Sequence, residues 1–172
     1  MRRLTPLLFA GLLLVASVAP TFAATSTQSA NTTVTVNTSI VLTGVPATID
    51  FGSAAVLTTA TAPTITARVV TNNRVGYNLG VVTSAMTSGT SSDTIPAPAL
   101  NYAVTLGTCT GAGTCTPSSG HPADGVTSLL IATANKRTSA VGDTYAVVPS
   151  LAVPFVDGAT YTGTAVFTAT SL

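Results

Sequence analysis

The sequence predicts an all-β, immunoglobulin-like sandwich of two sheets and about eight to nine strands, placed after a cleaved signal peptide. Three observations support this fold class. Apolar and polar side chains alternate in short runs rich in Thr and Val, turn-forming residues separate these runs, and no capped amphipathic helix is evident. Because β-branched residues favour extended backbone and weaken a helix, we expect the runs to be strands.

The N-terminus has the pattern of a secretory signal peptide. Arg2 and Arg3 precede the apolar run Leu7–Val18, which is too short to span a bilayer comfortably. Small residues occupy the cleavage positions up to Ala23. We therefore predict a signal peptide at residues 1–23, with an uncleaved membrane anchor as the alternative.

The mature chain, residues 24–172, has the length of a single domain, and its first residues, 24–30, are expected to be a flexible polar leader. Four basic and five acidic residues remain after cleavage, so the net charge is 4 − 5 = −1. No basic stripe could neutralise phosphates, and we therefore expect neither nucleic acid nor a membrane surface as a partner. A surface so poor in charge favours association with neighbours.

The clearest alternation runs from Tyr161 to Thr170, where most odd positions are apolar and most even positions are threonine. One face of that strand should therefore belong to the core. Turn residues bound the other runs, and Ser, Thr, Pro and Gly enrich two long predicted loops, Met86–Pro98 and Gly107–Pro122. Further strands are predicted at Thr33–Val36, Ser39–Leu42, Ala47–Phe51, Thr64–Val69, Gly76–Thr83, Leu100–Leu106, Val126–Thr133 and Tyr145–Val153.

Cys109 and Cys115 flank a five-residue, Gly-rich segment. Disulfides persist in exported proteins, so we expect the two cysteines to be paired and to rigidify one loop. The alternatives are a metal pair or a redox-active dithiol. Such metal sites need further Cys or His ligands, and redox sites favour a two-residue spacing.

Titratable groups suited to catalysis are few, since the chain has one histidine and no glutamate. The best hydrolytic constellation is His121 near Asp124 with Ser118 or Ser119, but all four residues lie in one Gly/Pro-rich segment that has no nucleophile-elbow motif. We assign no catalytic residue, cofactor or metal site, and a secreted hydrolase is the least favoured function.

Four tyrosines could be imagined as a platform on which sugar rings stack. Most of them lie on the apolar phase of their strands, so core packing is the preferred interpretation. They are Tyr77, Tyr102, Tyr145 and Tyr161.

After the first Thr/Val strand come four blocks, in the order Ala47–Gly52, Val69–Leu79, Val153–Phe155 and Tyr161–Phe167. This order resembles the WxL-type surface domain of Gram-positive bacteria. Tyr77 and Leu79 match the first Trp-x-Leu motif and Phe167 matches the second tryptophan, so both tryptophans are replaced. The resemblance implies a sandwich domain at the cell surface that associates non-covalently with the cell wall.

The predicted function is therefore a non-catalytic structural or adhesive protein, secreted or at the cell surface, whose partner is a cell-wall polymer or another surface protein. The alternative is a subunit of an extracellular fibre. In that case residues 24–42, which contain two predicted strands, would pair with a sheet edge of a neighbouring subunit. Pairing within its own sandwich is the expectation that competes with this donor-strand exchange.

Overall fold

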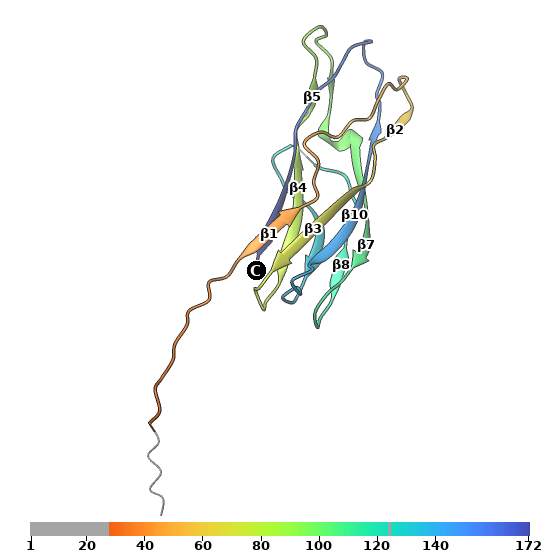
Figure 1. Cartoon of the computed structure of the whole chain (residues 1–172). Coiled ribbons are helices and arrows are strands. Elements are labelled where there is room, and N and C mark those ends of the chain that lie inside the picture. The colour runs from red at the N-terminus through yellow and green to blue at the C-terminus, as the bar shows by residue number, and fades with distance from the viewer. Residues whose placement is uncertain (1–27, 124) are drawn as a thin grey trace, which may run out of the picture. The chain divides into compact units, whose positions relative to one another are not determined.

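The computed structural model describes residues 28–123 and 125–172, and the predicted signal peptide lies outside them. The chain divides into two units at Thr35 and Val36. In the first unit, residues 28–35 are exposed and contain no strand. The second unit holds every strand that the structure describes (Figure 1).

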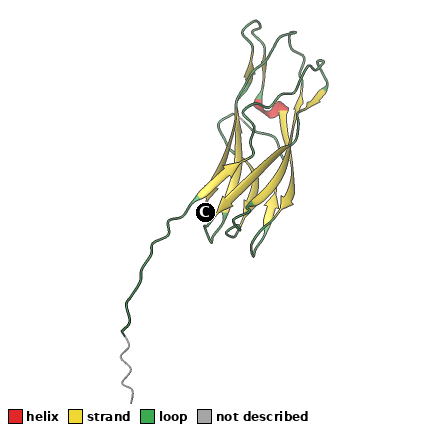
Figure 2. Ribbon diagram, viewed as in Figure 1, coloured by secondary structure: helices red, strands yellow, loops and turns green. Residues whose placement is uncertain are grey.

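The second unit is an all-β sandwich of antiparallel sheets, as the sequence predicts (Figure 2). In the first sheet β10 is central: β3 and β2 pair with one of its edges and β7 with the other, while β1 pairs with β3. The bounds are β1 (Ile40–Thr43), β2 (Thr59–Thr61), β3 (Ile65–Thr71), β7 (Leu100–Thr108) and β10 (Asp143–Ala152).

The second sheet has the order β11-β4-β9-β8, and a separate two-stranded hairpin joins β5 to β6. A 3-10 turn, η1 (Ala97–Ala99), leads into β7. The bounds are β4 (Tyr77–Thr83), β5 (Met86–Thr87), β6 (Thr94–Ile95), β8 (Cys115–Pro117), β9 (Leu129–Ala134) and β11 (Ala165–Ser171).

The core lies between the two sheets and is built from alternate residues of their strands. Alternation places every second side chain of β3 and β10 on the inner face, so both strands show a regular pattern of buried and less buried positions. Three tyrosines are fully buried, in agreement with the predicted core role: Tyr77, Tyr102 and Tyr145.

Two predicted strands are wrong, since Thr33–Val36 and Ala47–Phe51 have no strand conformation. The second follows Pro46, which cannot donate to a ladder, and ends in a turn in which Asp50 Oδ1 accepts from Gly52 N at 2.8 Å. Val126–Thr133 is right only in its second half. The two predicted loops contain the short strands β5, β6 and β8.

Candidate functional site

The predicted hydrolytic constellation is not assembled among the residues that the structure describes. The His121 Nδ1 atom lies 2.8 Å from the Leu100 carbonyl oxygen, and Ser119 Oγ accepts a hydrogen bond from the backbone N–H of Val104 at 2.8 Å. Ser118 donates its backbone N–H to Ile131. Asp124 is not among the described residues. Hydrolase activity therefore stays a prediction, and no hydrogen bond among the described residues joins His121 to Ser118 or Ser119.

The predicted disulfide is confirmed. Cys109 and Cys115 are bonded, with 5.9 Å between their Cα atoms. Their sulfurs and the Asp143 carboxylate lie close together, within 4.8 Å. This trio is a poor metal site, because the sulfurs are joined to each other and the carboxylate is held by a lysine.

That lysine and carboxylate form a buried ion pair beside the disulfide. Lys136 Nζ lies 2.9 Å from Asp143 Oδ2, and both side chains are almost fully shielded from solvent. Thr110, the residue after Cys109, donates both its backbone N–H and its hydroxyl to Asp143 Oδ1. Tyr77 donates its hydroxyl to Asp143 Oδ2 at 2.9 Å. The network therefore fastens the disulfide loop to the core.

These contacts set the pKa values of the network. Burial raises the pKa of Asp143, but hydrogen bonds from Lys136, Thr110 and Tyr77 outweigh burial and hold the pKa below its usual range. Burial, then the neighbouring Tyr145 and Asp143, raise the pKa of Tyr77 far above its usual value. At neutral pH the carboxylate is therefore charged and the phenol is neutral, which suits a structural role. The sequence alone does not reveal this pair, because the seven-residue spacing of Lys136 and Asp143 carries no recognisable motif.

A different feature, the edge of β11, offers a site for a partner. Among the described strands β11 pairs with β4 alone. The Thr164 carbonyl oxygen accepts from Ser84 N and the Leu172 N–H donates to the Gly76 carbonyl oxygen, so both residues direct these groups to the β4 side. Because backbone groups alternate along an antiparallel strand, the N–H and C=O groups of Phe167 and Ala169 face the other, unpaired edge.

Side chains at this edge are incompletely covered. The inward positions of β10 are fully buried, whereas those of β11 and β1 are only half-buried, although they pack on the core. Phe167 is one of them and contacts Tyr102 of the opposite sheet edge to face, with ring centroids 5.9 Å apart. β1 and β11 lie close together along this side, but within the described residues no backbone pairing joins them.

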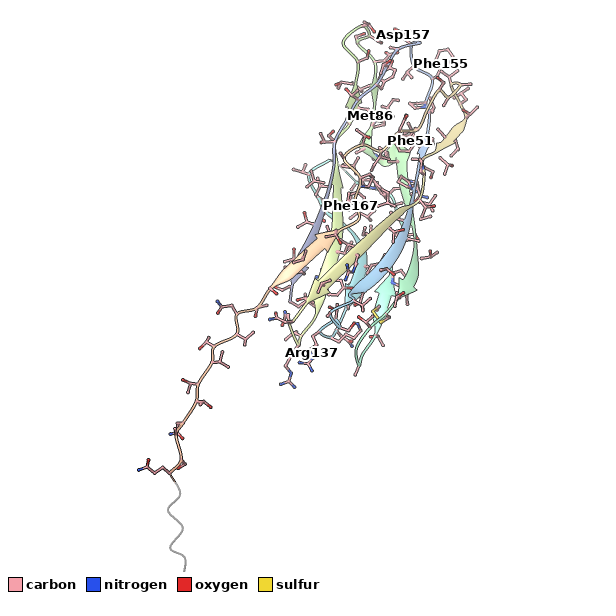
Figure 3. All side chains as sticks on the ribbon, viewed as in Figure 1. Phe51, Met86, Arg137, Phe155, Asp157 and Phe167 are labelled. Atoms are coloured by element: carbon pink, nitrogen blue, oxygen red, sulfur yellow. A yellow bond between two sulfur atoms is a disulfide. The ribbon has the colours of Figure 1, made fainter. Side chains whose placement is uncertain are left out.

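A groove, which we call the seam groove, lies at the N-terminal end of β11. Its lining includes residues 45–51, between β1 and β2, and residues 160–166, which lead into β11. Phe51 and Met86 contribute apolar side chains to its lining, and both are labelled in Figure 3 together with Phe167. The partly buried apolar residues along this side are Val45, Ile49, Phe51, Met86, Tyr161, Ala165 and Phe167.

The segment before β1 has the complementary pattern. In residues 33–36 threonine alternates with valine, and Val34 and Val36 are 86% and 75% exposed. The two valines therefore lie on one face of the segment if it extends, and Thr33 and Thr35 lie on the other. We call residues 30–36 the donor segment.

The residues that carry the family resemblance lie on adjacent strands. Tyr77 and Leu79 begin β4 and are fully buried, and Phe167 is paired in register with Val81 of the same strand. These three residues therefore pack in or against the core. Attachment to the cell wall stays a prediction.

Comparison with known proteins finds no family model, no curated protein and no solved structure that matches the chain. Within the described residues, none of the helices has the length and apolar character needed to cross a membrane.

Proposed function

We propose that the protein is a non-catalytic subunit of an extracellular fibre, in which the donor segment of one copy pairs with the edge of β11 in the next. The observation that carries this proposal is the pairing of features in one chain: an unpaired strand edge above a half-covered core, and an unpaired segment with alternating valines. Association with a cell-wall polymer, which the family resemblance implies, has no comparable support from the geometry.

The dimensions of the two features agree. Residues 30–36 and β11 each comprise seven residues, which extend to about 23 Å as strands. A strand added to β11 would satisfy the free backbone groups of Phe167 and Ala169, and its valines would cover the half-buried side chains below. Main-chain hydrogen bonds supply affinity in such strand addition, and the alternate side chains supply specificity.

A neighbouring copy is the acceptor in this proposal, and residues 37–39 connect the donor segment to β1 of its own copy. When each copy receives a segment from one neighbour and gives its own to another, the contact is heterologous, and it generates an open filament unless the rotation closes.

The experiment compares two double variants of the mature, secreted chain. V34D/V36D charges the apolar face of the donor segment, and the matched control T33D/T35D adds the same charge to the polar face. Each sample is checked by circular dichroism, analytical ultracentrifugation and negative-stain electron microscopy. We expect the wild type and T33D/T35D to assemble into fibres and V34D/V36D to remain a folded monomer. A wild type that stays monomeric at high concentration, or two variants that assemble equally well, would contradict the proposal.

A further inference from the structure

Two arginines and two aspartates of the second unit form an exposed pair of basic residues and a separate pair of acidic residues. Figure 3 shows Arg137 at one end and Asp157, with Phe155, at the other. Arg137 and Arg74 line the same hollow, and the backbone N–H of Asp157 donates a hydrogen bond to the Asp93 carboxylate. The only ion pair among the described residues is the internal one between Lys136 and Asp143. These four exposed or partly exposed charges therefore have no ionic partner within the part of the chain that the structure describes.

The acidic end is a rigid turn with an aromatic side chain on its surface. Asp157 donates its backbone N–H to Asp93 Oδ2 at 2.9 Å, and Asp157 Oδ2 accepts from Ser91 Oγ at 3.1 Å. Tyr161 donates its hydroxyl to the Asp157 carbonyl oxygen. Phe155 is 82% exposed in the same turn. We call Phe155, Asp157 and Asp93 the acidic tip.

The basic end is concave. Ser39, Asn72, Arg74 and Arg137 contribute to the lining of one hollow there, which we call the basic hollow. The chain enters the second unit at this hollow, since Asn72 Nδ2 donates to the Asn37 carbonyl oxygen at 2.8 Å and Asn72 Oδ1 accepts from Ser39 N at 2.7 Å. A copy that binds the donor segment must therefore lie near the basic hollow of the copy that supplies this segment.

The number of residues between the donor segment and the basic hollow limits the distance between them. Only Asn37 and Thr38 separate Val36, the last donor residue, from Ser39 of the hollow. Three such steps span at most about 10 Å. When the donor segment of one copy pairs with β11 of another, the basic hollow of the first must lie within about that distance of one end of β11.

The charges near each end of β11 favour one of the two possible orientations of the donor segment. A donor segment parallel to β11 would place Val36 near Ser171, where Asn73 donates to the Leu172 carbonyl oxygen next to Arg74. Basic residues would then face basic residues. An antiparallel donor aligned with β11 places Val36 near Ala165, and the chain before Ala165 leads back to the turn of Phe155 and Asp157. In this orientation opposite charges can face each other, whereas like charges directly opposed are disfavoured.

We propose that the acidic tip of one copy docks into the basic hollow of the next copy, so that ion pairs and an Arg–aromatic contact lock successive subunits and orient the donor segment antiparallel to β11. This inference rests on the proposed function, because donor exchange brings the two surfaces together. Arg74 and Arg137 face Asp157 and Asp93, and Phe155 provides an aromatic face on which a guanidinium can stack.

The test is a charge exchange within the full mature chain. R137E and D157R each place like charges at the junction, whereas the double variant R137E/D157R restores opposite charges between neighbours with reversed sign. Assembly is followed by light scattering at about 0.05 M and about 0.5 M salt. We expect each single variant to assemble about tenfold more slowly than wild type at low salt, and the double variant to recover most of the lost rate. F155A should also slow assembly.

The outcomes separate the two proposals. If wild type assembles, V34D/V36D does not, and the single charge variants match wild type at low salt, the docking proposal is overturned while the fibre proposal stands. Equal slowing in the single and the double variants would also overturn docking. If wild type itself never assembles, both proposals fall.

Discussion

Phe167 of β11 stands edge-on to Tyr102 of β7, with 90° between the ring planes and 5.9 Å between the ring centroids. Tyr102 is fully buried, and its hydroxyl shares a hydrogen bond with Thr83 at 2.9 Å. Phe167 is only half-buried. This contact is the point at which the packed core meets the half-covered side of the sandwich.

Removing the Phe167 ring should cost the monomer less than a core phenylalanine would. We expect F167A to lower the free energy of unfolding by about 1 to 2 kcal/mol, below the range of about 3 to 5 kcal/mol for a fully buried ring. The matched variant V166A, on the outer face of the same strand, should change it by less than about 0.5 kcal/mol. Denaturant unfolding of the V34D/V36D background measures both, and equal losses would contradict the assignment of faces.

Asp143 should matter far more than an exposed aspartate. D143N leaves Lys136 buried without its counter-charge, so we expect a loss of about 3 to 5 kcal/mol in the free energy of unfolding. D50N removes an exposed carboxylate that bonds only to its own turn, and should cost less than about 1 kcal/mol. Thermal and urea unfolding compare the two, and a D143N protein as stable as D50N would refute the role of the buried pair.

The lowered pKa of Asp143 also gives a pH dependence. An unfolded aspartate takes up its proton near pH 4, whereas the folded one does so at lower pH. Between these values the unfolded chain binds more protons, so stability decreases as the pH falls. The contribution is complete above about pH 5 and is lost below about pH 4. Unfolding measured from pH 7 to pH 2 should show a steeper acid loss in wild type than in D143N, and parallel curves would be inconsistent with this role.

Cleaving the disulfide should loosen one loop without unfolding the domain. The closed loop is short, so its loss should cost about 2 to 3 kcal/mol. Thr110 still bonds to Asp143 in C109A/C115A, which keeps the loop near the core. A lower melting temperature with an unchanged far-ultraviolet spectrum is the expected result. An unfolded variant would show that the bridge holds the fold itself.

The residue before β4 must be a glycine, and in this chain it is Gly76. Its φ is +114°, and a Cβ atom there would lie 1.8 Å from the Ala134 carbonyl oxygen of the neighbouring strand. G76A should therefore fold poorly or not at all, since both the backbone conformation and the space exclude a side chain. A Cβ atom at Gly158 would meet no other atom within 4 Å, so G158A serves as the control and should retain wild-type stability. Soluble yield and melting temperature report the difference.

Sequence alternation predicted most of the sandwich because burial on one face leaves a period of two in strands such as β3, β10 and β11. It failed at Thr33–Val36, where the same pattern marks a segment that has no partner strand in the part of its own chain that the structure describes. Local pattern specifies a strand-like segment, but only tertiary pairing decides whether it forms one. The ion pair of Lys136 and Asp143 was not predictable either, because a turn between β9 and β10 brings the two together.

Hydrogen exchange at the unpaired edge of β11 tests the central claim most directly. The backbone N–H groups of Phe167 and Ala169 face that edge, and a donor strand would protect them in the assembled wild type but not in V34D/V36D. The N–H groups of Val166 and Thr168, which face β4, serve as internal controls and should be protected in both proteins. We predict strong, assembly-dependent protection at Phe167 and Ala169. Equal exchange at these two amides in fibre and monomer would show that no strand is added to β11.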